Sequence, residues 1–227
     1  MTGPSARQPS PPAALVRRWL AGWAAARDLP DAEAVGDGVL RTRVGAPGRD
    51  VEYVVLDADA SPRRVDRAAL ASLDDRDPWI SVPTSDPGRV ADRLAEHGLA
   101  TAALPEWLME RALDAPSAAA LLPSGYAVRT DHPAPHCVEV LVTAPDGATA
   151  ASGRLGVAGG VGVPDRVSTA PGHRRRGLGS VVMGALGGAA VDLGCSRAVL
   201  VASQDGRRLY LTLGWDVVGA VVVARRR

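Results

Sequence analysis

Phenylalanine, lysine and asparagine are absent from this sequence of 227 residues, and Ile80 is its one isoleucine. Because lysine is missing, arginine alone makes up the 26 Lys and Arg positions, against 25 acidic residues, and the net charge is +1. This balance excludes the strong long-range attraction to nucleic acid or anionic membranes that a basic protein has. We therefore expect no nucleic-acid partner and no membrane partner.

Cysteine is also scarce, since Cys137 and Cys195 stand far apart and lack the spacing of a metal site or a redox pair. We expect no bound metal and two ordinary thiols, as in a cytoplasmic protein. Residues 1–12 lack the basic and then apolar pattern of a signal peptide, and their prolines and small polar residues predict disorder. No apolar run reaches the length needed to span a bilayer.

Hydrophobic periodicity and turn residues predict an α/β half over residues 13–115. Its helices are expected at Ala13–Arg27, Pro62–Leu73, Pro87–His97 and Glu106–Leu113. Ser61 and Asp86 are expected to cap the second and third of these helices. Its strands are expected at Val39–Val44, Val51–Leu56, Trp79–Val82 and Leu99–Leu104.

Pro116, Pro123 and an alanine run predict a boundary between residues 114 and 125, followed by a second domain over residues 125–227. Strands of this domain are expected at Tyr126–Thr130, Cys137–Thr143, Thr149–Val157, Val161–Ala170, Arg197–Ala202 and Trp215–Ala224. Its helices are expected at 177–193 and Asp205–Leu213. Alternating strands and helices favour a layered fold of the α/β or α+β class.

Residues 167–180 run from a strand through a loop into a helix, and Arg174, Gly177 and Gly179 form the pattern R-x-x-G-x-G. Glycines allow successive backbone N–H groups to point inward, and the helix start adds its unpaired N–H groups and positive end. A pyrophosphate is the natural ligand of such a loop. Positive charge for the phosphate oxygens comes from Arg174, Arg175 and Arg176. The loop lacks the ending of a P-loop and the spacing of a dinucleotide fingerprint.

A second motif follows further along the chain, where the strand at 198–201 precedes Leu209, Tyr210, Gly214 and Trp215. In this order, the two motifs resemble the acetyl-CoA-binding core of the GNAT N-acetyltransferase superfamily, with Trp215 in place of the usual phenylalanine. The resemblance is strongest toward the C-terminus. It implies a mixed, mostly antiparallel sheet flanked by helices, with acetyl-CoA as cosubstrate in a cleft between the middle strands.

The resemblance also implies roles for single residues. The residues that would bind the cofactor are Val167, Ser168, Thr169, Arg174, Arg175, Arg176, Gly177, Leu178, Gly179, Ser180 and Ser203. Tyr210 would protonate the departing thiolate, because a phenol with a pKa of about 10 can donate a proton as a thiol with a pKa of about 8.5 leaves. Asp165 is the first candidate for the base and Glu139 the second, since Val163 stands where some relatives carry a catalytic glutamate.

One departure from the family pattern leaves the acceptor site open. Few residues separate the strand at Tyr126–Thr130 from Cys137, where relatives place two helices that form much of the acceptor site. The first half is interpreted either as a degenerate GNAT-like copy, with Ser81–Leu104 matching Val201–Val217, or as an unrelated α/β cap. In both cases the acceptor contacts lie between the halves, where Trp79, Trp107 and Met109 are candidates.

Three functions remain open from the sequence. The first is transfer of an acetyl group from acetyl-CoA to a primary amine of a small molecule or a protein, by direct attack in a ternary complex. The second is a non-catalytic acyl-CoA-binding module with a regulatory or interaction role. The third is nucleotide binding at the glycine-rich loop. A monomer and a homodimer are both compatible with the sequence.

Overall fold

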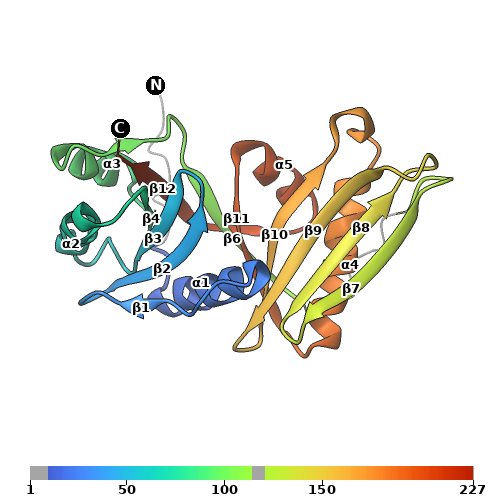
Figure 1. The fold of residues 1–227 in the computed structure, drawn as a ribbon, viewed down its shortest axis with the longest axis horizontal. Helices are drawn as coiled ribbons and strands as arrows, with labels where there is room; N and C mark the ends of the chain where they lie inside the picture. Colours follow the sequence, from blue (N-terminus) through green and yellow to red (C-terminus); the bar gives the residue numbers. More distant parts are fainter. Residues whose placement is uncertain (1–9, 114–120, 227) are drawn as a thin grey trace, which may run out of the picture.

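The computed structural model describes residues 10–113 and 121–226, so the disorder expected before residue 10 and most of the expected boundary at 114–125 lie outside it. Within these residues, 12 strands form one mixed sheet (Figure 1). The helices are α1 (Ala13–Arg27), α2 (Arg63–Ala71), α3 (Pro87–Glu96), α4 (Leu178–Asp192) and α5 (Gln204–Thr212). Short 3-10 turns cover Ser72–Asp74 and Pro171–His173.

The strands of the first half are β1 (Glu33–Ala34), β2 (Val39–Ala46), β3 (Arg49–Val55), β4 (Pro78–Thr84), β5 (Ala100–Thr101) and β6 (Glu106–Ala112). Those of the second half are β7 (Ala127–Ala134), β8 (Cys137–Thr143), β9 (Thr149–Ala158), β10 (Val161–Thr169), β11 (Arg197–Ala202) and β12 (Asp216–Arg225). Their order in the sheet is β1-β2-β3-β4-β12-β6-β11-β10-β9-β8-β7, with β5 beside β12. The mixed, mostly antiparallel sheet flanked by helices that we expected is confirmed.

Both faces of the sheet are covered. Helix α1 packs on one face, where its Leu20 and Trp23 share a core with Val163 of β10 and Leu108 of β6. Helices α2 and α3 cover the opposite face at one end of the sheet, and α4 and α5 cover that same face toward the other end. Because α1 contacts β9 and β10, the first helix of the chain belongs to the packing of the second half.

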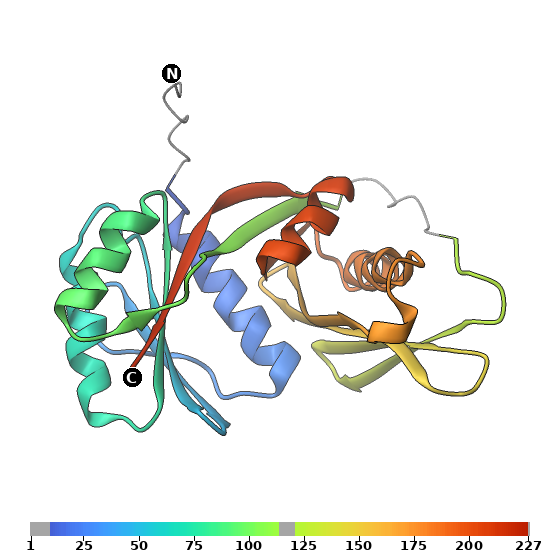
Figure 2. The same ribbon diagram turned by 90° about the horizontal axis from the view of Figure 1, so that it is seen from above.

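The last strand of each half pairs with a strand of the other half. Strand β12 pairs with β4 of the first half, and β6 pairs with β11 of the second half. Figure 2 shows β6 and β12 crossing the middle of the molecule side by side, and they pair with each other there. On either side of this pair, the order strand–helix–strand recurs with parallel strands, β3–α2–β4 in one half and β10–α4–β11 in the other. The two halves therefore repeat one topology within a single sheet.

The helix predicted at Glu106–Leu113 is wrong, because these residues form β6 in the centre of the sheet. Leu108 and Met109 are both fully buried but belong to cores on opposite faces, which is possible only with the alternation of a strand. The strand expected at Leu99–Leu104 shrinks to the two residues of β5. The cap expected at Ser61 is also wrong, since Pro62 occupies the N-cap position without a side-chain bond. The Asp86 cap is confirmed by its bond from the Arg89 N–H, 3.1 Å.

Candidate active site

Strands β10 and β11 pair in parallel over a short stretch and then diverge. They are in register only at Val161 with Arg197 and at Gly162 with Ala198. Strand β10 continues beside β9 as far as Thr169, with a bulge between Asp165 and Ser168, whereas β11 continues beside β6. We call the region between the diverging strands the fork.

The edge of β10 that faces the fork carries backbone groups with no neighbouring strand. The Ala170 N–H donates to the Ala150 carbonyl of β9 at 2.9 Å. Since backbone groups alternate along the regular part of a strand, the N–H and C=O groups of Thr169 point the other way, into the fork. The Arg174 Nε donates to the Thr169 carbonyl at 3.2 Å, which agrees with this direction. An extended ligand can therefore pair with this edge as an added strand would.

The loop between β10 and α4 points backbone N–H groups toward the same region. Arg175 and Gly177 have φ angles of 63° and 78°, and Gly177 is the N-cap of α4. Left-handed residues at the start of a helix form a concave set of N–H donors, and the first N–H groups of the helix lack partners within it. Leu178, 1% exposed, anchors the first turn in the core. The R-x-x-G-x-G motif predicts an anion cradle at this loop, and these N–H groups are the ones that would form it.

Gly179 lets three elements meet at the cradle. A Cβ atom on Gly179 would lie 3.0 Å from Cδ2 of Leu209 on α5 and 4.0 Å from Oγ1 of Thr169 on β10. A larger residue would therefore require the Leu209 side chain to shift by a few tenths of an ångström. The second glycine of the motif serves close packing, whereas Gly177 serves backbone conformation.

The arginines of the loop differ in their contacts. Arg176 donates from Nη1 to the Tyr126 hydroxyl at 2.9 Å, and Arg174 is held by the Thr169 carbonyl. Arg175 is exposed and makes no hydrogen bond or ion pair with any residue in 10–113 or 121–226. It is therefore the most available of the arginines for a phosphate.

Tyr126 is a residue of the site that the sequence analysis missed. Besides binding Arg176, its hydroxyl shares a hydrogen bond with Nδ1 of His173 at 2.9 Å, and the two rings meet edge to face. Tyr126 precedes β7, so it ties the cradle loop to the outer strands. The sequence carries no local signal for this contact, because 47 residues separate the partners.

Tyr210 projects from α5 into the core beside the fork. It is 8% exposed, and its ring centroid lies 5.9 Å from that of Trp215. Burial raises the pKa of Tyr210 to about 12, and the negative charge of Asp165 adds to the shift. The phenol is therefore protonated at neutral pH. Ser203 acts as the N-cap of α5, accepting from the Gly206 N–H at 3.2 Å, which orients the helix that carries Tyr210.

Asp165 is held in an ion pair that the sequence did not reveal. Both carboxylate oxygens accept from Arg27 at the end of α1, at 2.7 Å from Nε and 3.0 Å from Nη2. The Asp165 side chain is only 13% exposed. A carboxylate with both oxygens engaged is poorly available as a base. Glu139 of β8 forms an ion pair with Arg154 of β9 at 3.1 Å. Both strands lie on the side of β10 that is away from the fork.

A cluster of charged and aromatic side chains gathers near the end of α1, and we call its members the α1 cluster: Trp23, Arg27, Arg49, Glu52 and Glu106. The guanidinium groups of Arg27 and Arg49 lie 4.6 and 5.2 Å from the ring centroid of Trp23. Glu52 is fully buried and accepts from Nε of Arg49 at 2.8 Å and from Ser81 at 2.6 Å.

Glu106 differs from the other carboxylates of the α1 cluster. It begins β6, one residue before Trp107, which pairs with Ala202 at the end of β11. Glu106 lies on the α1 face with Leu108, and it accepts no hydrogen bond from any residue that the structure describes. Burial raises its pKa above the usual value; Arg49 and Arg27 oppose this shift and Glu52 adds to it. Glu106 is thus a half-buried carboxyl without a fixed partner.

The tryptophan and methionine candidates for acceptor contacts have other neighbours. Trp107 donates to Gln204 at 3.0 Å and lies under the guanidinium of Arg207, and Met109 is fully buried in the core. Trp79 lies under Arg49, at 4.9 Å from its ring centroid. Trp79 is therefore the one of these three residues that adjoins the α1 cluster.

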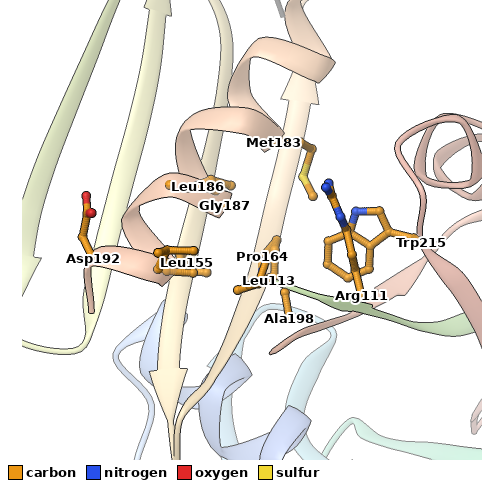
Figure 3. A pocket seen from close by; sticks show the side chains of 13 residues that line it. Arg111, Leu113, Leu155, Pro164, Met183, Leu186, Gly187, Asp192, Ala198 and Trp215 are labelled. Carbon is orange, nitrogen blue, oxygen red and sulfur yellow. The ribbon is translucent and has the colours of Figure 1, made fainter. Parts of the chain in front are cut away.

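A cavity of about 220 Å³ lies on the α4 side of the sheet, where the fork closes (Figure 3). Pro164 and Ala198 line it from β10 and β11, and Met183 and Gly187 line it from α4. Trp215, whose ring adjoins Tyr210, forms another wall. Within residues 10–113 and 121–226, no three potential metal-binding side chains gather, and no helix has the length and hydropathy to cross a membrane.

Comparison with known proteins agrees with this geometry. The model of the acetyltransferase (GNAT) family matches residues 104–215, from just before β6 to the start of β12. No curated protein matches the chain in sequence. Among solved structures, the chain is similar to a GCN5-related N-acetyltransferase from Kribbella flavida, at 18% identity and a TM-score of 0.66, over 94% of this chain and 95% of that one.

Two further structures share the fold. One is a GCN5-related N-acetyltransferase from Sphaerobacter thermophilus, at 16% identity and a TM-score of 0.56, over 83% of this chain and 76% of that one. The other is a tandem GNAT protein from the clavulanic acid biosynthesis pathway, at 14% identity and a TM-score of 0.53, over 84% of each chain. Together with the fork, the cradle and the buried tyrosine, the family match identifies residues 104–215 as a domain of the acetyltransferase (GNAT) family.

Proposed function

We propose that this protein is an N-acetyltransferase that transfers an acetyl group from acetyl-CoA to a primary amine. One observation carries the proposal: the free edge of β10 leads from the cradle at Gly177 toward the protonated phenol of Tyr210. An anion cradle, an unpaired strand edge and a proton donor are thus arranged in the order in which pyrophosphate, pantetheine and thioester follow one another in acetyl-CoA. Nucleotide binding alone would leave the strand edge and Tyr210 without a role.

The residues present fit acetyl-CoA along its length. The N–H groups of residues 175–179 would hold the pyrophosphate, with Arg175 as the most available cation. The Ser180 N–H donates to the Gly177 carbonyl at 3.0 Å instead. The backbone groups of Val167 and Thr169 would pair with the amides of pantetheine. Ser168 points away from the fork toward β9, so its contribution is to the strand rather than to the ligand. Ser203 would act by capping α5.

Two proton transfers are required of the protein. The amine nitrogen bonds to the acyl carbon as the C–S bond breaks, and Tyr210 gives its Oη proton to the leaving sulfur. Its raised pKa of about 12 means that the phenol holds its proton at neutral pH before the reaction begins. A base must take a proton from the amine, directly or through water, and we assign this to Glu106, because Asp165 is occupied by Arg27. Asp165 then serves to hold α1 and to keep Tyr210 protonated.

We also propose that residues 13–115 are a second, degenerate GNAT-like copy. The repeat of β3–α2–β4 and β10–α4–β11 supports this reading over an unrelated cap. In the first copy, the loop between β3 and α2 carries Asp57 and Asp59 where the second copy carries arginines and glycines. Carboxylates repel phosphate, so this copy would not bind the cofactor. Because β6 and β12 pair within one chain, we propose a monomer. The two free thiols of Cys137 and Cys195 support our proposal that it is located in the cytoplasm.

Calorimetric titration with acetyl-CoA tests the proposal, with ATP and NAD as controls. We expect selective binding at micromolar Kd, followed by thiol release when primary amines are supplied. Binding without thiol release for any amine would favour the non-catalytic acyl-CoA-binding module. The short turn between β7 and β8 supports this alternative, since it leaves no acceptor helices there. Absence of binding by folded protein would refute both functions.

A further inference from the structure

The cavity at the closed end of the fork has no role in acetyl transfer. Its lining is mostly apolar, and small residues create the space: Gly187, Gly188 and Ala190 on α4 and Ala198 on β11. Cβ atoms on Gly187 or Gly188 would meet nothing within 4 Å. The side chains around an empty apolar cavity lose packing contacts. The small residues around this cavity therefore suggest that a ligand occupies it.

Residues of the cavity wall adjoin residues of the site. Pro164 in its lining directly precedes Asp165, and Ala198 is the last residue of β11 in register with β10. Trp215 contacts Tyr210 on one side and the cavity on the other. A group that extends from a sulfur beside Tyr210 would have to pass Trp215 and Pro164 to reach the cavity.

The charged residues of the lining leave its middle apolar. Figure 3 shows Arg111 next to Trp215 and Asp192 on the far side of Leu155, with Met183 and Pro164 between them. At about 30 Å³ for a group of the size of a water molecule, 220 Å³ accommodates about seven such groups. This matches an unbranched chain of several methylenes.

We propose that the cavity binds the hydrocarbon part of an acyl-CoA longer than acetyl, so that the donor substrates include unbranched acyl-CoAs up to about hexanoyl. The inference rests on the proposed function, since it extends the donor at the same site. Burial of a methylene contributes about 0.8 kcal/mol, which is about a fourfold gain in affinity for each one added.

The experiment measures Kd for acetyl-, butyryl-, hexanoyl- and decanoyl-CoA with the wild-type protein, Gly187→Leu and Gly184→Leu. Gly184 is the matched control: it lies on the same helix, a Cβ there also meets nothing within 4 Å, but it does not line the cavity. We expect affinity to rise about fourfold per methylene up to hexanoyl and to fall for decanoyl. Gly187→Leu should remove this gain and leave the Kd for acetyl-CoA unchanged, whereas Gly184→Leu should keep it.

The possible failures are distinct. Equal affinity of the wild-type protein for all four thioesters overturns only the proposal for the cavity. A gain in affinity with chain length that persists in Gly187→Leu overturns the same proposal. If no acyl-CoA binds to the folded protein, the proposed function fails as well. The four Kd values of the wild-type protein test the proposal for the cavity even if a variant does not fold.

Discussion

The carboxylate of Asp165 accepts two hydrogen bonds from the guanidinium of Arg27, which lies 138 residues earlier in the sequence. This pair joins the end of α1 to the bulged part of β10. It places an N-terminal residue next to the carboxylate that adjoins Tyr210. The first helix is therefore part of the site's support, and its removal would alter both stability and catalysis.

Breaking the Arg27–Asp165 pair should destabilise the protein by about 2 kcal/mol, between the values for exposed and buried pairs, because both side chains are mostly buried. Chemical denaturation of Arg27→Ala, Asp165→Ala and the double variant measures the loss and the coupling between them. The exposed pair of Arg129 and Asp131 is the control, and Arg129→Ala should change stability by less than about 0.5 kcal/mol. Additive effects of the two substitutions at Arg27 and Asp165 would show that the pair contributes nothing.

Gly177→Glu should weaken binding of acetyl-CoA by about 100-fold or more, because it forces a side chain into a left-handed position and adds negative charge at the cradle. Calorimetry measures the change. Gly147→Glu is the matched control, since Gly147 has a φ of 85° in the turn between β8 and β9, away from the fork. It should cost similar stability without changing Kd. Equal loss of affinity in both variants would contradict the assignment of the cradle.

Tyr210→Phe should lower kcat by about 10²- to 10⁴-fold and leave the Kd for acetyl-CoA nearly unchanged, because the hydroxyl acts only as the thiolate forms. Tyr126→Phe should do the reverse, raising Kd with little effect on kcat, since Arg176 and His173 of the loop lose their hydrogen bonds to the Tyr126 hydroxyl. Steady-state kinetics and titration on both variants separate the two roles. A parallel loss of affinity in Tyr210→Phe would rule out the general-acid assignment.

Glu106→Gln should lower kcat by about 10²- to 10⁴-fold at neutral pH and abolish the acidic limb of the pH–rate profile. A base must be deprotonated to act, so activity in the wild-type protein falls as pH drops through the pKa of Glu106. Because burial raises that pKa, the limb should lie above the range of an ordinary glutamate. Glu110→Gln is the control on the same strand, where Glu110 pairs with Arg197 at 2.6 Å. An unchanged limb in Glu106→Gln would assign the base elsewhere.

Stability should decline between pH 10 and pH 12. Burial raises the pKa values of Tyr53 and Tyr210 to about 12, against about 10 in the unfolded chain. Above pH 10 the unfolded state releases these protons first, so the free energy of unfolding falls with rising pH, by about 2 kcal/mol for each tyrosine. Denaturation at pH 8, 10 and 11 measures this, and no lysine titrates in the same range because the chain has none. Tyr53→Phe and Tyr210→Phe should flatten the decline; an unaltered slope in both would refute this origin.

Local pattern accounts for much of the fold and for the cradle. The helix at Ala13–Arg27 and the strands at Cys137–Thr143 and Arg197–Ala202 have the predicted bounds, because their periodicity and flanking turn residues suffice. Gly177 at the N-cap of α4 likewise follows from the local motif. These features depend on neighbours within a few residues, which a sequence displays directly.

Contacts between distant residues account for what the sequence did not reveal. A seven-residue segment such as β6 has too few apolar positions to distinguish a strand from a helix, and its partners β11 and β12 lie far along the chain. The role proposed for Glu106 could not be predicted either, because it depends on the burial of this residue and on the nearby charges of Arg49 and Arg27. The restraint of Asp165 by Arg27 was hidden for the same reason.

The exchange of β6 and β12 has a consequence for biosynthesis. Strand β4 is left with one edge open until residues 216–225 have emerged from the ribosome, because β12 is its neighbour there. Such long-range pairing slows folding and exposes unpaired edges that invite association between nascent chains. We therefore expect the first half to depend on chaperones, or to remain incompletely structured, during translation, and both halves to reach the native state together after synthesis of β12.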